Sequence, residues 1–196
     1  MKIYYINLDQ RLDRKHQIEA ELNNMGLIGE RYPAIFNENA PIGCSESHLN
    51  LLKKIKEEKL EKAIIFEDDF RFIVDKKFLN SFFKQISEVD FDLIMMGYNL
   101  IRSEPYNDFL GKVLEAQTAS GYIVHSKFYD KLISCWEEGL ELYKKYPQEH
   151  WNYINDMYWK RLQPISNWYY SLNRIGRQRS SYSDLSKIYK EEQENY

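Results

Sequence analysis

The sequence contains only two cysteines, Cys44 and Cys135, and neither lies in a CxxC pair or has the histidine spacing typical of a zinc site. A metal-binding cysteine motif is therefore not expected. Both cysteines are flanked by helix-like sequence, which predicts two free thiols, in or near the core, in a protein of a reducing compartment.

Long apolar runs and an excess of positive charge are also lacking. No run approaches the ~20 apolar residues that span a bilayer, and the stretch MKIYYINLDQRLDR turns charged after eight residues, unlike a signal peptide. The chain has 27 basic and 30 acidic residues and a net charge of −3, which argues against a nucleic-acid-binding protein. We expect a cytoplasmic protein, and peripheral attachment to a membrane that carries the substrate stays open.

Aromatic residues, in contrast, are abundant, with 16 Tyr, 10 Phe and 4 Trp. Tyr and Trp combine an apolar face with a polar tip, so they serve both cores and polar-ligand pockets such as sugar sites. An AT-rich genome, which enriches Tyr, Lys, Asn and Ile, is the alternative explanation. The 196 residues, 43% of them hydrophobic, suffice for a single domain, 1–196, with a sizeable core.

Strand-like and helix-like segments alternate over the first hundred residues. The expected strands are 2–8, 32–35, 63–69, 91–98, 112–116, 121–125 and 166–172. The expected helices are 13–26, 45–62, a helix capped by Asp75, 126–145, 148–162 and an acidic C-terminal helix, with loops at 101–111 and 173–184. This alternation predicts an α/β fold with a largely parallel sheet, which binds ligands at the carboxyl ends of its strands.

The stretch AIIFEDDF places three carboxylates, Glu67, Asp68 and Asp69, directly after a buried strand. If the stretch is extended, Glu67 and Asp69 share one face and Asp68 points the other way. Two carboxylates on one face suit Mg²⁺ or Mn²⁺, ions that complete their shell with substrate phosphates. The alternative is a surface loop of acids that pair with Arg71 or Lys76, and the cluster alone does not decide between them.

Three further segments carry charged and polar residues at the ends of expected elements. YYINLDQRLDR (4–14) is a strand followed by acids and two arginines. IGCSESHLNLL (42–52) places Ser47 and His48 near an expected helix start, where backbone N–H groups and the dipole attract anions. IGRQRSSYSDL (175–185) adds Arg177 and Arg179.

Together with SGYIVHSKFYDKL (120–132), and in this order along the chain, these segments resemble glycosyltransferase family 25. That family includes bacterial lipooligosaccharide glycosyltransferases and the collagen galactosyltransferases. The resemblance implies a GT-A-type, Rossmann-like nucleotide-sugar fold with a mixed, largely parallel central sheet. It also implies an inverting, Mn²⁺- or Mg²⁺-dependent transfer of galactose or glucose from a UDP-sugar to a lipooligosaccharide-like glycan or a hydroxylysine-type acceptor.

The resemblance also implies roles for individual residues. Asp69 would bind the metal, and Glu67 would reach the metal or the ribose. Asn7, Asp9 and Arg11 would lie near the uridine. The full set expected around the nucleotide sugar is Asn7, Asp9, Arg11, Ser47, Glu67, Gly121, Tyr122, Arg177, Gln178 and Arg179.

An inverting transfer needs a general base that takes the proton of the acceptor hydroxyl. Asp156 matches an acidic position in the family's late helix and is the leading candidate, and an exposed helical residue paired with Lys160 at i+4 is the alternative. His48 is the second catalytic candidate, and its alternative is a core or capping histidine. The aromatic residues expected to stack on a sugar are Tyr153, Tyr158 and Trp159.

The chain departs from the family in its short length and in the compressed segment FNENAPI before Gly43. A catalytically impaired, glycosyltransferase-like binding or scaffold protein is therefore the alternative function. A metal-dependent phosphoesterase ranks last, because His48, His125 and His150 are scattered without HxH or HExxH spacing. The acceptor, the choice between galactose and glucose, and the oligomeric state stay open.

Overall fold

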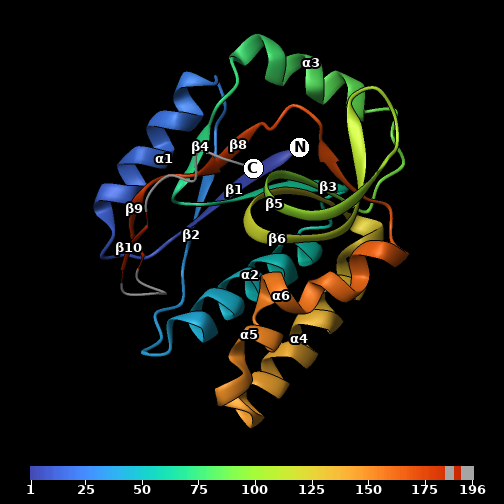
Figure 1. Cartoon of the computed structure of the whole chain (residues 1–196). Helices are drawn as coiled ribbons and strands as arrows, with labels where there is room; N and C mark the ends of the chain where they lie inside the picture. Colours follow the sequence, from blue (N-terminus) through green and yellow to red (C-terminus); the bar gives the residue numbers. More distant parts are fainter. Residues whose placement is uncertain (184–187, 191–196) are drawn as a thin grey trace.

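The computed structural model describes residues 1–183 and 188–190, which are built around a central mixed β-sheet (Figure 1). Within them the sheet has six strands in the order β2-β1-β3-β6-β5-β7. Their bounds are β1 Lys2–Asn7, β2 Glu30–Pro33, β3 Lys62–Glu67, β5 Leu93–Pro105, β6 Leu110–His125 and β7 Trp168–Ser171. β6 runs antiparallel to its neighbours β3, β5 and β7, and the other five strands share one direction. The predicted α/β fold with a mixed, largely parallel sheet is confirmed.

Helices cover both faces of this sheet. Figure 1 shows α1 and α3 on one side and α2, α4, α5 and α6 on the other. Their bounds are α1 Leu12–Asn24, α2 Ala40–Glu57, α3 Lys76–Ile86, α4 Tyr129–Lys145, α5 His150–Tyr153 and α6 Asn155–Tyr158. Alternate residues of β1 serve the two faces, as the two-residue period of a strand requires: Tyr4 packs in the core under α2 and α4, and Tyr5 in the core under α1 and α3.

Short elements connect and extend this framework. β4 (Phe70–Phe72) pairs antiparallel with β8 (Gly176–Gln178), and β9 (Ser181–Ser183) pairs with β10 (Ile188–Lys190). The 3₁₀ segments are η1 Ser126–Phe128, η2 Pro147–Glu149 and η3 Trp159–Ile165. The pairing of β4 with β8 joins the segment after β3 to the arginine-rich segment near the other end of the chain.

Several predicted boundaries are wrong for identifiable reasons. The segments 112–116 and 121–125 belong to one strand, β6, and the loop expected at 101–111 is largely the end of a β5–β6 hairpin. The helix expected at 148–162 is divided into η2, α5, α6 and η3, because Ile154 adopts an extended backbone between α5 and α6. The prediction of a C-terminal helix is wrong for Ile188–Lys190, which form the strand β10, and its remaining residues, 184–187 and 191–196, lie outside the described part of the chain.

Other local predictions are confirmed. Asp75 caps α3, and its side chain accepts a hydrogen bond of 2.7 Å from the Phe78 N–H. Cys44 and Cys135 are both free thiols, and Cys135 is buried. None of the described helices has the length and apolar character needed to cross a bilayer.

Candidate functional site

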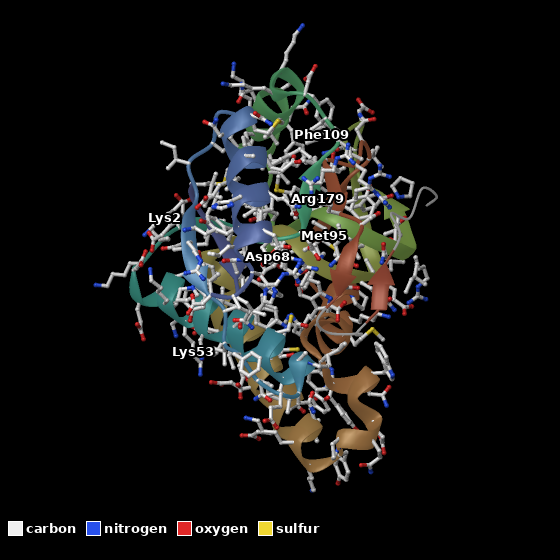
Figure 2. All side chains as sticks on the ribbon, turned by 90° about the vertical axis from the view of Figure 1, so that its left-hand side faces the viewer. Lys2, Lys53, Asp68, Met95, Phe109 and Arg179 are labelled. Carbon is white, nitrogen blue, oxygen red and sulfur yellow. The ribbon has the colours of Figure 1, made fainter. Side chains whose placement is uncertain are left out.

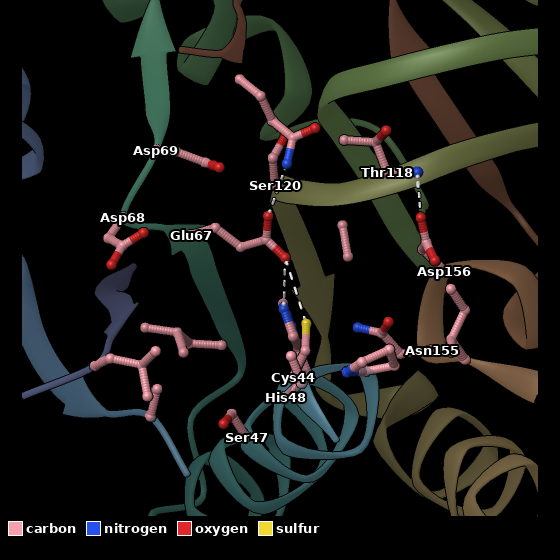
Figure 3. A pocket seen from close by; sticks show the side chains of 18 of the residues that line it. Cys44, Ser47, His48, Glu67, Asp68, Asp69, Thr118, Ser120, Asn155 and Asp156 are labelled. Carbon is pink, nitrogen blue, oxygen red and sulfur yellow. Dashed lines mark hydrogen bonds and ion pairs between the residues drawn. The ribbon is translucent and has the colours of Figure 1, made fainter. Parts of the chain in front are cut away.

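A cavity of about 1290 Å³ opens at the carboxyl end of β3 (Figure 3). It collects most of the side chains that the sequence singled out. The predicted residues that line it are Asn7, Ser47, His48, Glu67, Asp69, Asp156, Arg177, Gln178 and Arg179. Polar side chains of an α/β fold gather at this edge because the carboxyl ends of parallel strands meet there.

The three carboxylates do not alternate as the sequence suggested. β3 ends at Glu67, and Asp68 and Asp69 form the turn into β4, so the two-residue alternation of a strand stops before it reaches them. All three line the cavity, and Asp68 is only 7% exposed. The alternative interpretation, a loop of acids on the surface, is therefore wrong.

Asp68 is held by polar partners from the start of the chain. Its carboxylate accepts hydrogen bonds from Asn7 Nδ2 at 2.8 Å and from Arg14 Nη1 at 3.1 Å. The same Arg14 nitrogen lies 3.6 Å from Asp69 Oδ2. Burial raises the pKa of Asp68, and the charge of Arg14 opposes this rise. Arg14 is thus an internal counter-charge of the acidic turn.

Asp69 is less well compensated. Its Oδ1 is buried and has no hydrogen-bond partner among the described residues. Burial, and then the negative charge of Glu67, raise the pKa of Asp69 to about 7. A buried carboxylate oxygen without a partner is unfavourable unless a cation or a donor binds there. The residues present therefore fit a divalent cation, as the family resemblance implies.

Glu67 connects the acidic turn to α2 and β8. His48 Nε2 lies 3.2 Å from its Oε1, Cys44 Sγ lies 3.9 Å from the same oxygen, and Gln178 Nε2 donates to its Oε2 at 3.2 Å. Burial would raise the pKa of Glu67, but the hydrogen bond from His48 and the charges of His48 and Arg14 outweigh it and lower the pKa. Glu67 is accordingly the ionised member beside Asp69.

The helix that carries His48 begins earlier than predicted. α2 starts at Ala40 with Pro41 in its first turn, a position that suits proline, so Ser47 and His48 lie within the helix. The expectation of an anion site at their backbone N–H groups is wrong, because those groups bond within the helix. The Ser47 hydroxyl donates to the Gly43 carbonyl at 2.6 Å and accepts from the Ile35 N–H at 2.8 Å.

β8 brings the arginine-rich segment against the acids. Gln178 lies opposite Phe70 in the β4–β8 ladder, and the Arg179 N–H donates to the Asp69 carbonyl at 2.7 Å. Figure 2 shows Asp68 and Arg179 near the middle of one face, with Lys2 and Lys53 toward its edge. The Arg179 guanidinium itself donates to Glu21 at 2.6 Å.

Asp156 lies across the cavity from the acidic turn, on α6 (Figure 3). Its Oδ2 accepts a hydrogen bond of 3.1 Å from the Thr118 N–H, and Thr118 has a φ of 83°, which is rare for a residue with a side chain. Burial raises the pKa of Asp156, and the Thr118 N–H opposes the rise. Lys160 pairs with Glu115 at 3.2 Å, so the predicted alternative, an exposed Asp156–Lys160 pair, is wrong.

Two predicted residues of the nucleotide-contacting turn lie away from the cavity. The side chain of Asp9 is 80% exposed and accepts a hydrogen bond from Arg31 at 2.5 Å. Arg11 forms an ion pair of 2.9 Å with Asp13. Neither lines the cavity, although Asn7 and Gln10 from the same stretch do.

The two predicted residues of β6 are also not part of the lining. Gly121 packs so closely on Phe70 that a Cβ atom would lie 2.5 Å from its ring. Tyr122 is fully buried, and its hydroxyl lies 3.0 Å from His48 Nδ1. Tyr122 is therefore placed to orient the histidine from behind the cavity.

The predicted sugar-stacking role of Tyr158 and Trp159 is wrong, since both are buried in the core at 1% and 0% exposure. Two other aromatic residues line the cavity and stay exposed, Phe36 and Trp151. Phe36 and Trp151 lie far apart along the chain, so no sequence motif predicts that they line the same cavity.

Five further residues that line the cavity had been given no site role from the sequence, and Asp68 had been expected to point away from it. The five residues are Arg14, Cys44, Thr118, Ser120 and Asn155. Arg14 stood in a quoted segment, but only the packing of α1 on β4 brings it to the acids. The Ser120 hydroxyl and Asn155 Nδ2 are buried without a hydrogen-bond partner among the described residues. Both are therefore available to a polar ligand.

Comparisons with known proteins agree with the resemblance. Residues 38–108 match the model of glycosyltransferase family 25, described as an LPS biosynthesis protein. Procollagen galactosyltransferase 1-B of Xenopus laevis is 27% identical over 127 residues, which cover 49% of this chain. The matched region spans about a fifth of that relative, 21% of its length. The resemblance to family 25 is confirmed.

Two solved structures share the fold. A glycosyltransferase involved in the glycosylation of the major capsid of PBCV-1 superposes with a TM-score of 0.52 at 10% identity, covering 95% of both chains. A mannose-1-phosphate geranyltransferase from Thermus thermophilus gives a TM-score of 0.51 at 8% identity, covering 89% of this chain and 74% of the other. At such identities the likeness shows the fold alone.

Proposed function

We propose that this chain, in which the match to glycosyltransferase family 25 covers residues 38–108, is a glycosyltransferase that moves a hexose from a UDP-sugar to an acceptor hydroxyl with inversion. One observation carries the proposal: the acidic turn and Asp156 line opposite walls of one cavity and have different partners. The acidic turn has the positive charge of Arg14 beside it, whereas Asp156 accepts a hydrogen bond from a backbone N–H. The sugar is galactose or glucose, and the acceptor is a glycan or a hydroxylysine-type residue. The domain is proposed to comprise the whole chain, 1–196.

The acidic turn serves as the donor side. Asp69 and Glu67 would hold Mn²⁺ or Mg²⁺, which when bound neutralises the charge of the diphosphate leaving group. The Oδ1 of Asp69, which has no hydrogen-bond partner in the described part of the chain, supports this assignment. Arg177 and Arg179 line the same wall and carry the guanidinium donors that match phosphate oxygens.

The uridine is assigned to the adjoining part of the cavity. Asn7 lies there, at the end of β1 beside Asp68, and Ser47 and His48 border it from α2. Asp9 and Arg11 remain proposed contacts that would need the turn after β1 to close over the nucleotide. Gly121 and Tyr122 would support the donor-sugar side without contacting the sugar, because they pack behind the cavity wall against Phe70 and His48.

Asp156 acts as the general base in this proposal. The acceptor oxygen attacks the anomeric carbon, the bond from that carbon to the diphosphate oxygen breaks, and the hydroxyl proton passes to the Asp156 carboxylate. The hydrogen bond from the Thr118 N–H fixes the carboxylate, and its raised pKa makes it a stronger base than an exposed aspartate.

The remaining polar groups suit a carbohydrate. Ser120 Oγ and Asn155 Nδ2 are buried on the cavity wall without a partner among the described residues, so each is stabilised when a sugar hydroxyl binds to it. A cavity of about 1290 Å³ exceeds the usual volume for one small ligand, roughly 300–1,000 Å³, and has room for donor and acceptor together.

A donor screen tests the proposal. Purified protein is incubated with UDP-galactose, UDP-glucose and other nucleotide sugars, with and without Mn²⁺, and UDP release is measured. We expect metal-dependent release with one hexose donor, and release that is slower by about 10²–10⁴-fold from the Asp156→Asn variant. Absence of both turnover and calorimetric UDP binding would overturn the proposal, whereas UDP binding without turnover would favour the scaffold alternative.

A further inference from the structure

Three different ligand-type side chains converge at one point of the cavity wall. Cys44 and His48 lie one helical turn apart on α2, so they share one face of the helix, and Glu67 reaches them from the end of β3. Cys44 Sγ, His48 Nε2 and one Glu67 oxygen all lie within 4.8 Å of one another. Figure 3 shows the cysteine and the histidine side by side, both directed at Glu67.

The separations suit a tetrahedral metal ion. His48 Nε2 lies 3.2 Å and Cys44 Sγ lies 3.9 Å from Glu67 Oε1. Ligands that bind zinc at about 2.0–2.3 Å in a tetrahedron are roughly 3.3–3.7 Å apart. Side-chain rotations that move the ligand atoms by about one ångström or less would bring all three into this range.

The histidine already has the outer partner that a metal ligand needs. His48 Nδ1 lies 3.0 Å from the Tyr122 hydroxyl, and the two rings stack at a centroid distance of 5.9 Å. When Nε2 binds a metal, the proton is on Nδ1 and is donated to the tyrosine oxygen, which holds the ring in orientation. Gln178 similarly holds the second oxygen of Glu67 at 3.2 Å.

The surroundings favour a cation and leave an open position. All three residues line the cavity, so a fourth ligand, water or substrate, can reach the ion from that side. Asp68 and Asp69 line the same cavity nearby and add carboxyl groups to it. A thiol, an imidazole and one carboxylate form a softer ligand set than Mn²⁺ or Mg²⁺ prefers, and one typical of zinc.

We propose that Cys44, His48 and Glu67 form a binding site for a zinc-type transition-metal ion. The thiol binds as the thiolate, and its proton is released to solvent when the ion enters. The site shares Glu67 with the Mn²⁺ site proposed above but differs from it in Cys44 and His48, and it does not depend on glycosyl transfer.

Cobalt(II) titration of the whole protein, freed of metal, tests the site because tetrahedral cobalt–thiolate bonds have characteristic spectra. We expect one equivalent of cobalt to produce a near-ultraviolet thiolate charge-transfer band and intense visible bands, and zinc to displace it. The Cys44→Ser variant should lose the near-ultraviolet band. Cys135→Ser is the matched control and should keep it, because Cys135 is buried in α4, outside the cavity.

Tyr122→Phe tests the outer partner and should weaken cobalt affinity about 10-fold with the same spectrum. Circular dichroism of each variant checks its fold, and zinc should raise the thermal midpoint of the unaltered protein but not of Cys44→Ser. Two results would overturn the proposal: no tetrahedral cobalt spectrum, or a spectrum unchanged in Cys44→Ser. Asp156→Asn should keep the spectrum even though its transfer is slowed, which separates this proposal from the proposed function.

Discussion

Both walls of the cavity carry carboxylate side chains, but the neighbours of these carboxylates differ between the two walls. On the β3 wall, three carboxylates are crowded together, and Asn7, Arg14 and His48 supply the hydrogen bonds and positive charge that keep them there. On the α6 wall, Asp156 is a single, partly buried acid, and its carboxylate accepts a hydrogen bond from a backbone N–H. The side-chain group is a carboxyl on both walls, so its partners decide its chemistry.

The difference assigns the roles. The acids of the β3 wall have one internal arginine, and among the residues that the structure describes one oxygen of Asp69 has no hydrogen-bond partner, so this group can bind an additional cation. A partly buried acid with a raised pKa, such as Asp156, is prepared to take a proton. A two-substrate reaction needs both at a distance from each other, with the reacting atoms between them.

The largest expected effect is the loss of kcat/KM on changing a carboxylate of the β3 wall. Asp69→Ala should lower kcat/KM for UDP-sugar turnover on the order of 10³-fold, because it removes a proposed ligand of the cation that would neutralise the charge of the diphosphate leaving group. Asp68→Asn is the control and should lose less, since Asp68 bonds to Asn7 and Arg14 within the protein. Equal losses in the two variants would contradict the division of labour within the turn.

The second effect tests the opposite wall. Asp156→Asn keeps the shape and the acceptor for the Thr118 N–H but cannot take a proton, so kcat should fall about 10²–10⁴-fold. Calorimetric UDP binding should stay nearly unchanged, because the donor side is intact. A variant with normal kcat would show that another group is the base.

The third effect concerns stability. Arg14→Met leaves buried acids without their counter-charge and should lower the free energy of unfolding by about 3–5 kcal/mol in urea titrations. Arg11→Met removes an ion pair with the exposed Asp13 and should cost at most about 1 kcal/mol. If both variants were equally stable, Arg14 would not be the internal counter-charge.

The smallest effect is a dependence on pH. The pKa of Asp69 is about 7 in the folded chain and 3.8 for an unperturbed aspartate, so between these values the folded state binds more protons than the unfolded one. Stability from this group is therefore present at low pH and lost as the pH rises toward 7. Asp69→Asn should remove that loss and be more stable than the unaltered protein at about pH 8, by on the order of 2 kcal/mol.

Thermal unfolding at about pH 5 and about pH 8 measures this difference. The gain from Asp69→Asn should be larger at the higher pH. A gain that does not change with pH would mean that Asp69 titrates as an ordinary aspartate.

Much of the local structure followed from short-range patterns. The apolar run before Glu67 is a buried strand, Asp75 caps its helix, and the alternation in β1 places Tyr4 and Tyr5 on opposite faces. These features depend on near neighbours along the chain, which the sequence displays directly. The family resemblance likewise depends on the order of motifs along the chain.

Short-range patterns failed where the chain changes direction or where distant segments pair. The apolar spacing of 148–162 resembled one helix, but the extended backbone at Ile154 lets Tyr158 and Trp159 enter the core. The sequence alone also argued against a zinc site, because neither cysteine lies in a CxxC pair or has the histidine spacing typical of such a site. Glu67 lies further along the chain and becomes a neighbour of Cys44 and His48 only when α2 packs beside β3.

By itself the sequence determined the fold class, the family resemblance and the acidic end of β3, because strand period, helix capping and motif order are local properties of the chain. Only the tertiary structure decided which partners these acids have: Arg14 from α1, Gln178 from β8, His48 from α2. The reason is physical. The pKa and ligand preference of a carboxylate depend on burial and on charges within a few ångströms, and those neighbours come from segments far apart in the chain.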